Sequence, residues 1–421
     1  MTTANVLDEL EWRGLIAHST DRDALRAALG EGSVKFYVGF DPTAPSLHMG
    51  HLVQVLTAKR LQDAGHTPYA LVGGATGMIG DPRDSGERTL NSLDTVKEWT
   101  ERVRQQVSRF VSFEGANAAT TVNNYDWTAS LSTIDFLRDI GKHFPVNRML
   151  ARDTVRRRLD SGISYTEFSY VLLQSMDYLN LFREHGVALQ FGGSDQWGNI
   201  TGGAELVRRV TGESVYAFAT PLITKSDGTK YGKTEGGALW LDGSMMSPYA
   251  FHQFWLNVED EKVGELLRIF TFLTRDEIED LEQQTAEKPF LRAGQKRLAD
   301  EVTALVHGEH EVEQAKAAAA ALFGGGDLSS ISPDTLSSAL REAGGTSIPA
   351  GELPGILDLL VTAGLVKSKG DARRTVAEGG AYLNNVRIED PELRPTEDDL
   401  VAGSWLVLRR GKKNFAGVQV A

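Results

Sequence analysis

The sequence predicts an α/β protein: a parallel sheet covered by helices, then a helical region, then a small α+β tail. Three observations support this fold class. Short β-rich runs alternate with amphipathic helical runs through the first half, which is typical of a parallel sheet with helices on both faces. From about residue 245 to 323 the pattern is helical. A stretch rich in Gly, Ser and Pro then precedes a compact last segment.

The first predicted strand is "VKFYVGF" (34–40), and the apolar residues from Met49 to Leu56 recur at the spacing of a helix face. The second strand is "YALVGG" (69–74). The alternation then continues with helices near 96–110, 132–142 and 166–185 and with strands at 120–127 and 187–193. Ligands of such sheets bind beyond the carboxyl ends of the strands, so we expect functional residues in those loops.

With 421 residues the chain is too long for one compact core, so several domains are expected. Breaker-rich stretches suggest where they divide. We predict a sheet domain, a helical domain, a linker and a tail domain, at 1–235, 236–323, 324–353 and 354–421.

The composition excludes several classes of protein. There are no cysteines, which rules out disulfides and thiolate metal sites and is compatible with a reducing cytoplasm. The first residues lack a basic n-region and a long apolar run, so we expect no signal peptide, no membrane span and a cytoplasmic protein. The net charge of −13 argues against a nucleic-acid binder. Residues 355–421, however, carry ten Lys and Arg against nine Asp and Glu.

The stretch "PSLHMGHLVQVL" (45–56) places His48 and His51 one turn apart at the start of a predicted helix, with Gly50 between them. Ser46 is the expected N-cap. A helix N-terminus attracts anions, and two imidazoles would add donors aimed at the same point. The pattern therefore predicts a phosphate site. Capping or core histidines explain the residues about equally well.

A second candidate is "KSDGTKYGKT" (225–234), which places Lys230 and Lys233 three residues apart in a glycine-broken stretch. Such lysines can neutralise phosphate groups. A solvated turn is the simpler interpretation of these residues alone.

The predicted helix 166–185 carries Tyr170, Gln174 and Asp177 on one face, while most of its other residues are apolar. A buried polar stripe needs partners, and a small polar ligand could supply them. A stripe that faces water is the alternative.

The tail has two basic clusters, which together predict a local phosphate-binding surface on an acidic chain. The alternative for each cluster is a solvated charged face. One cluster lies on a short predicted helix and the other at the end of the chain; their residues are Lys369, Arg373 and Arg374, and Arg409, Arg410, Lys412 and Lys413.

"HMGH" resembles the H-x-G-H signature of class I aminoacyl-tRNA synthetases, and "YVGFDPTAPSLHMGHL" is similar in particular to the bacterial tyrosyl branch. The resemblance covers essentially the whole chain, in the same order. It implies a Rossmann-like parallel-sheet catalytic domain, an α-helical anticodon-side domain and a small α+β S4-like RNA-binding domain.

The resemblance also assigns residues. Catalytic roles fall on Thr43, His48, His51, Lys230 and Lys233. ATP binding falls on those histidines and lysines and on Gly39, Asp41, Gly50 and Asp195. Tyrosine binding falls on Tyr37, Thr76, Asp81, Tyr170, Gln174, Asp177 and Gln196, with Asn124 near the substrate. The lysine loop corresponds to K-M-S-K-S, but Tyr231, Gly232 and Thr234 depart from that pattern. Arg88, in the altered stretch 83–88, is carried over as a phosphate contact.

The implied activity joins tyrosine and ATP to tyrosyl-adenylate and pyrophosphate, and then passes the tyrosyl group to the 3′-terminal adenosine of tRNA(Tyr). The resemblance further implies Mg²⁺ entering with ATP, no metal site built by the protein, and a homodimer. Of the tail's basic residues, Lys369, Arg373, Arg374, Arg409 and Lys412 would contact the tRNA. Two alternatives remain: a tryptophanyl-type synthetase, and an RNA-binding or regulatory protein on an inactive synthetase scaffold.

Overall fold

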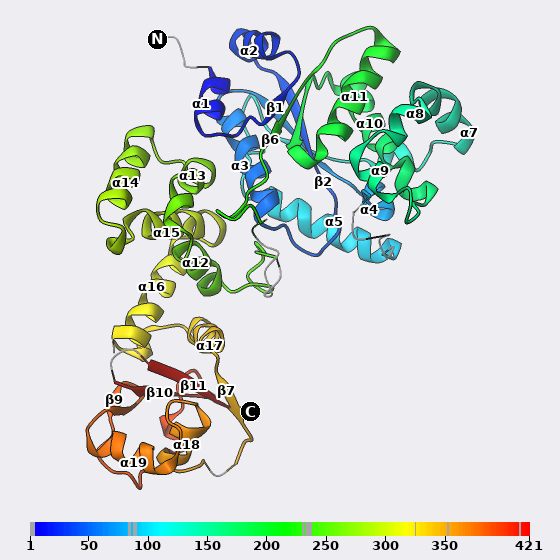
Figure 1. Cartoon of the computed structure of the whole chain (residues 1–421). Helices are drawn as coiled ribbons and strands as arrows, with labels where there is room; N and C mark the ends of the chain where they lie inside the picture. Colours follow the sequence, from blue (N-terminus) through cyan, green and yellow to red (C-terminus); the bar gives the residue numbers. More distant parts are fainter. Residues whose placement is uncertain are drawn as a thin grey trace. The chain divides into compact units, whose positions relative to one another are not determined.

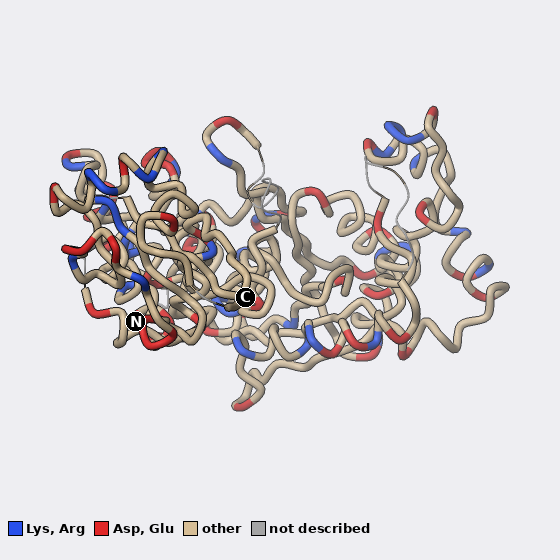
Figure 2. Tube along the Cα trace, turned by 90° about the horizontal axis from the view of Figure 1, so that it is seen from below, with Lys and Arg blue, Asp and Glu red and all other residues tan. Residues whose placement is uncertain are grey.

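The computed structural model describes residues 5–82, 86, 91–229, 231, 238–324, 326–351, 353–411 and 414–421. By contacts the chain forms two compact units, and each is described by itself (Figure 1). Unit 1 comprises Met1–Leu241 and Gly264–Ile278, and unit 2 comprises Asp242–Val263 and Glu279–Ala421. Acidic and basic residues are interspersed along the trace (Figure 2).

Unit 1 is built on a six-stranded sheet in the order β1-β6-β5-β2-β3-β4. All neighbours are parallel except β1, which pairs antiparallel with β6, so the predicted parallel sheet is confirmed. The chain order reverses between β2 and β5, which is where ligands bind in such sheets. The strands are β1 (His18–Ser19), β2 (Lys35–Phe40), β3 (Thr67–Val72), β4 (Thr120–Asn123), β5 (Leu189–Gly193) and β6 (Tyr216–Thr220).

The long helices of unit 1 pack on this sheet as the alternating sequence predicts. Helices α10 and α11 approach each other closely at Gly203. A Cβ at this position would lie 3.2 Å from the Tyr178 side chain. Their side chains share one apolar core with Tyr37, Tyr69 and Leu71 of the sheet. The long helices are α3 (Met49–Asp63), α5 (Leu93–Val107), α10 (Tyr165–His185) and α11 (Trp197–Thr211).

Two predicted elements differ in the structure. The strand expected at 120–127 ends at Asn123, because the Asn123 carboxamide oxygen accepts a hydrogen bond from the Tyr125 amide (3.0 Å) and turns the chain into α6 (Tyr125–Thr128). The helix expected at 132–142 is helical over 133–143 but changes type along its length: α7 (Thr133–Asp135) continues as a π-helix (Phe136–Ile140) and then as a 3₁₀ helix (Gly141–His143).

Shorter helices complete unit 1, and most of them connect the longer elements. They are α1 (Val6–Trp12), α2 (Arg22–Glu31), α4 (Thr76–Ile79), α8 (Val146–Leu150), α9 (Asp153–Arg158) and the 3₁₀ turn η3 (Ser194–Gln196). None of the helices that the structure describes is both long and apolar enough to span a lipid bilayer.

The region predicted to be helical is helical. Helices α13 and α14 each begin or end in unit 1, whereas the others lie wholly in unit 2. The helices are α12 (Pro248–Leu256), α13 (Asp260–Phe270), α14 (Arg275–Glu287), α15 (Ala293–His307), α16 (Glu309–Gly324) and α17 (Pro333–Glu342).

The tail is a five-stranded sheet in the order β7-β11-β10-β8-β9 with two helices. Leu406 and Leu408 of β10 belong to a core with the tail helices, whereas Trp405 and Val407 belong to a second core with α16 and α17. The elements are β7 (Thr346–Ile348), α18 (Ile356–Thr362), α19 (Lys369–Ala377), β8 (Ala381–Leu383), β9 (Val386–Arg387), β10 (Trp405–Arg410) and β11 (Asn414–Val420).

The stretch predicted as a linker, 324–353, contains α17 and also β7, which pairs in parallel with β11 of the tail. Part of this stretch is therefore built into the tail's sheet. The division into four domains stays a prediction.

Candidate active site

Helix α3 begins with the predicted histidine pair, but Ser46 is not its N-cap. His48 is the N-cap: its Nδ1 accepts the Gly50 amide (3.1 Å), and Nδ1 of His51 accepts the His48 amide (3.2 Å). The Ser46 hydroxyl instead donates to the Leu47 carbonyl (2.7 Å). A Cβ at Gly50 would lie 3.0 Å from the His48 ring, so glycine gives this imidazole room to fold back over the helix start.

The two imidazoles stack with ring centroids 3.9 Å apart. Because each Nδ1 accepts a backbone N–H, each neutral ring carries its proton on Nε2. Burial lowers the pKa of His48, and burial together with the His48 ring lowers the pKa of His51 further. The pair therefore stays neutral at pH 7 and offers two Nε2–H donors. The Nδ1 atoms of His48 and His51 cap the start of α3, which is one of the two predicted roles.

Asp41, which follows β2, joins two other predicted residues. Its carboxylate accepts hydrogen bonds from the Tyr170 hydroxyl and from the Thr76 hydroxyl, both at 2.6 Å. A Cβ at Gly73 would lie 2.0 Å from an oxygen of this carboxylate, so only glycine fits there. The Asp41 carboxylate therefore links the segments that follow β2 and β3 to the polar face of α10.

Asp177, on the same face of α10, is buried at 2% exposure. Its carboxylate accepts hydrogen bonds from Nδ2 of Asn124 (3.0 Å) and from Nε1 of Trp127 (2.9 Å). Burial raises the pKa of Asp177 to about 7, although both hydrogen bonds act in the opposite direction. The buried Tyr37 hydroxyl has no hydrogen-bond partner among the described residues. Its pKa is raised, mainly by burial and then by the Asp177 charge.

Asn124 holds the Asp177 cluster in place. Its Oδ1 accepts the Ala75 amide (2.7 Å), which fixes the orientation of the carboxamide. Its Nδ2 then donates both to Asp177 and to the Thr76 hydroxyl (2.9 Å). The predicted residues Thr76 and Asp177 are thus linked through one fully buried side chain.

The side chains of Asp81 and Gln196 are also in contact. Asp81 accepts Nε2 of Gln196 (2.9 Å) and Nδ2 of Asn199 (3.2 Å), and burial raises the pKa of its carboxyl. The Gln174 amide oxygen is buried without a hydrogen-bond partner among the described residues. The polar face of α10 is therefore turned inward rather than toward water.

The other predicted ATP-side residues lie at the carboxyl edge of the sheet. Thr43 is exposed in the loop after β2, and its amide donates to the Asp41 carbonyl (2.8 Å). Gly39 lies near the end of β2, where a Cβ would make an ordinary 3.7 Å contact with Leu71. Asp195 follows β5, and its charge acts on the His48 imidazole.

Sequence reasoning missed three polar side chains of this site. Trp127 and Asn199 donate to Asp177 and Asp81, and Arg152 donates to the Asn199 carboxamide oxygen. Their spacing in the sequence shows no periodic pattern, so only a resemblance to relatives could have identified them.

Some of the residues named from the sequence lie outside the described residues. They are Arg88, Lys230, Gly232, Lys233, Thr234, Lys412 and Lys413.

Three basic residues of the tail are exposed and form ion pairs with acidic residues. Lys369 pairs with Asp358 (2.6 Å), Arg373 with Glu392 (2.8 Å) and Arg374 with Asp371 (3.1 Å). On β10, the Arg409 guanidinium lies 4.4 Å from the Tyr382 ring centre, and Arg410 donates to the Leu365 carbonyl (3.0 Å).

Comparisons with known proteins agree with this arrangement. A family model described as "tRNA synthetases class I (W and Y)" matches residues 30–324, and one described as "Tyrosine--tRNA ligase SYY-like C-terminal domain" matches residues 341–418. The tyrosine–tRNA ligase of Streptomyces coelicolor is 59% identical over 419 residues, and that of Kineococcus radiotolerans is 59% identical over 417. Each alignment covers 99% of both chains.

Among solved structures, a C-terminally truncated mitochondrial tyrosyl-tRNA synthetase from Aspergillus nidulans is 31% identical, with a TM-score of 0.66. The match covers 74% of this chain and 92% of that one. Both family models and the full-length relatives lead to the same conclusion: the chain belongs to the tyrosine–tRNA ligases, within the class I tRNA synthetases.

Proposed function

We propose that the site described above activates L-tyrosine with ATP and then charges tRNA(Tyr), as membership of the family implies. In the first step a tyrosine carboxylate oxygen bonds to the α-phosphorus of ATP and pyrophosphate leaves. In the second, a hydroxyl of the terminal ribose takes the tyrosyl group and AMP leaves. Neither step needs a covalent nucleophile from the protein, so positioning and electrostatic stabilisation supply the rate.

One observation carries the amino-acid assignment: the buried Asp177 carboxylate acts electrostatically on the Tyr37 hydroxyl, which has no hydrogen-bond partner among the described residues. A phenol hydroxyl between them could donate to Asp177 and accept from Tyr37. Phenylalanine would leave both groups unpaired, which is a strong basis for rejecting it. The indole of tryptophan can donate but cannot accept, so it would leave the Tyr37 hydroxyl unsatisfied.

We assign the substrate ammonium to the other end of the same network. Asp81 supplies the negative charge, and Gln196 and Tyr170 are oriented by Asp81 and Asp41 respectively. The buried Gln174 oxygen and the Thr76 hydroxyl are further acceptors within that network.

We assign the ATP phosphates to the start of α3. The two Nε2–H groups of His48 and His51 and the helix dipole all favour an anion there. Thr43, Gly39, Gly50, Asp41 and Asp195 complete the proposed ATP site. Lys230, Lys233 and Arg88 are proposed for the pyrophosphate.

Mg²⁺ enters this proposal only with ATP, whose phosphates it would screen. Among the described residues, no three His, Asp or Glu side chains are grouped so that they could hold a metal ion.

We further propose a cytoplasmic homodimer. Apolar side chains between α7 and the start of α10 are exposed at 37–68%, which is unusual for a solvent-facing surface and supports a second copy packing there. They are Ile134, Leu137, Val146, Leu150, Leu159 and Tyr165.

We propose that the tail, as an S4-like domain, binds the tRNA through Lys369, Arg373, Arg374, Arg409 and Lys412. The ion pairs of Lys369, Arg373 and Arg374 are exposed, so exchange of their acidic partners for RNA phosphates would cost little. The predicted division at 1–235, 236–323, 324–353 and 354–421 belongs to the same proposal.

The deciding experiment is amino-acid-dependent ATP–pyrophosphate exchange with tyrosine, phenylalanine and tryptophan, followed by tRNA charging. Exchange with tyrosine alone is expected. Exchange with tryptophan would refute the pocket assignment. No exchange from folded protein that still binds tRNA would favour the RNA-binding alternative.

A further inference from the structure

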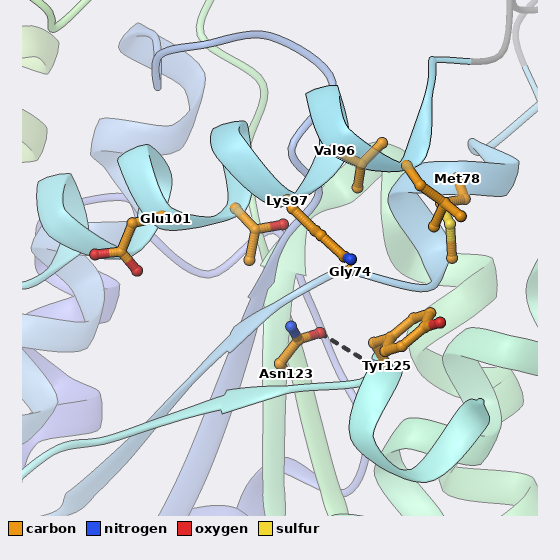
Figure 3. A pocket seen from close by; sticks show the side chains of 9 residues that line it. Gly74, Met78, Val96, Lys97, Glu101, Asn123 and Tyr125 are labelled. Carbon is orange, nitrogen blue, oxygen red and sulfur yellow. Dashed lines mark hydrogen bonds between the residues drawn. The ribbon is translucent and has the colours of Figure 1, made fainter. Parts of the chain in front are cut away.

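A cavity of about 170 Å³ lies between α4, α5 and the carboxyl ends of β3 and β4 (Figure 3). Its walls are largely apolar, with Met78, Leu93 and Val96 on the helices and the Tyr125 ring opposite. None of the described residues that line it belongs to the tyrosine or ATP assignments above. A volume of about 150 Å³ is enough for one benzene ring.

Two polar groups on one side of this cavity, those of Lys97 and Thr100, have no partner among the described residues. Lys97 forms no ion pair with any described residue, and its ammonium group extends from α5 toward Gly74 (Figure 3). The Thr100 hydroxyl, which also lines the cavity, is buried, and no described residue forms a hydrogen bond with it. The Asn123 carboxamide oxygen is used by the Tyr125 amide (3.0 Å), which leaves the Nδ2 group of Asn123 as a further donor.

The acidic group at the edge of the cavity is already neutralised. The Glu101 carboxylate accepts two hydrogen bonds from Arg104 (2.7 and 2.8 Å) and one from Gln105 (2.9 Å). Arg104 balances the charge of Glu101, so Glu101 is not the partner of the Lys97 ammonium. Among the described residues that line the cavity, Lys97 is the one whose charge is not balanced by an ion pair.

The cavity is separate from the tyrosine-side network, although the two are neighbours. Asn123 and Asn124 are consecutive at the end of β4, and their side chains point apart: Asn124 reaches Thr76 and Asp177, whereas Asn123 lines the cavity. Gly74 makes room for this arrangement, since a Cβ there would lie 2.3 Å from the Asn123 oxygen.

We propose that this cavity binds a small aromatic carboxylate of about the size of benzoate. The ring packs among the apolar walls, where Met78 sulfur and the Tyr125 ring both favour an aromatic ligand. The carboxylate meets the Lys97 ammonium, and its two oxygens accept from the Thr100 hydroxyl and the Asn123 amide. A ring without the negative charge would leave the Lys97 side of the cavity unsatisfied.

The test uses ¹⁹F NMR of 4-fluorobenzoate added to the full chain, with and without excess tyrosine. Saturable binding is expected in both conditions. Lys97→Met should weaken it about two- to fivefold, the range for a solvent-exposed charge pair, and Thr100→Val should also weaken it. Arg102→Met is the matched control, because Arg102 lies on the same helix and pairs with Glu98 (2.8 Å) rather than lining the cavity. It should leave the affinity unchanged.

Three results would overturn the proposal: displacement of the probe by tyrosine, equal affinity for 4-fluorobenzamide, or equal weakening by Lys97→Met and Arg102→Met. Circular dichroism of each variant shows whether it is folded, and Thr100→Val keeps the test open if Lys97→Met is not. The affinity of each variant for 4-fluorobenzoate is measured independently of tyrosine binding. Failure of the proposed function is therefore distinguishable from failure of this second site.

Discussion

Replacing Asp177 by Asn tests the amino-acid pocket directly, because both neighbours of Asp177 can only donate to it. Trp127 offers an indole N–H, and the Asn124 carboxamide is locked by the Ala75 amide so that its Nδ2 faces Asp177. An asparagine has one oxygen and one NH₂ group, so it can satisfy only one of these donors. A tyrosine hydroxyl would lose a charged acceptor.

The expected loss is that of a hydrogen bond to a charged group, about 1.5–3 kcal/mol. This corresponds to a weakening of tyrosine binding by about 10- to 150-fold. Calorimetric titration of the full chain with tyrosine would measure it. Asp126→Asn, an exposed carboxylate next to Trp127, is the control and should bind tyrosine normally.

The same residue predicts a pH dependence. A phenol donates to the carboxylate form, so with the pKa of Asp177 at about 7 tyrosine affinity should fall about tenfold for each pH unit below 7. Asp177→Asn should remove this part of the slope. An Asp177→Asn variant that is folded and binds tyrosine within twofold of the parent chain would refute the reasoning.

Stability should show the opposite trend. Asp177 ionises near pH 7 in the folded chain but near pH 4 when unfolded, so the folded state binds the extra proton between these values. The contribution of Asp177 to the free energy of unfolding is therefore fully present below about pH 4 and is lost as the pH rises to 7, by about 4 kcal/mol. Urea denaturation of the parent chain and Asp177→Asn across this range would measure the difference.

Three further variants test other parts of the structure. His51→Ala should lower the rate of adenylate formation about 10²- to 10³-fold through loss of one donor, with tyrosine affinity unchanged; an unchanged rate in single-turnover assays would contradict the role. Gly73→Ala should displace Asp41, whose oxygen would lie 2.0 Å from the new Cβ, and weaken tyrosine binding, whereas Gly32→Ala, with open space around it, should not. Trp405→Ala should lower the free energy of unfolding by about 3–5 kcal/mol in urea titrations, and a loss below 1 kcal/mol would show that this side chain does not hold β10 to the core with α16 and α17.

The sequence alone predicts those parts of the fold that depend on local patterns. The strand at 34–40, the helix that follows it and the polar face of α10 all have the expected period, and the structure confirms them. The change of helix type within 133–143 was not predictable, because its apolar residues also fit one continuous α-helix.

The site was predictable only in part, because its residues are joined across the sheet. Tyr170 and Asp177 share a helix face and were found by spacing. Their partners Asp41 and Asn124 follow the ends of other strands, and Trp127 lies in α6, which follows β4. Strand order brings these groups together, and spacing along the chain does not reveal strand order.

Strand β10 also determines where this chain can be cut and rejoined. Its alternate side chains serve two cores, one with α18 and α19 and one with α16 and α17, so neither core is complete without it. A chimera that exchanges residues 354–421 for a foreign tail would have to match the surface of α16 and α17 as well as its own helices. The tail and its helical support therefore form one exchangeable block, and recombination between related enzymes should preserve them together.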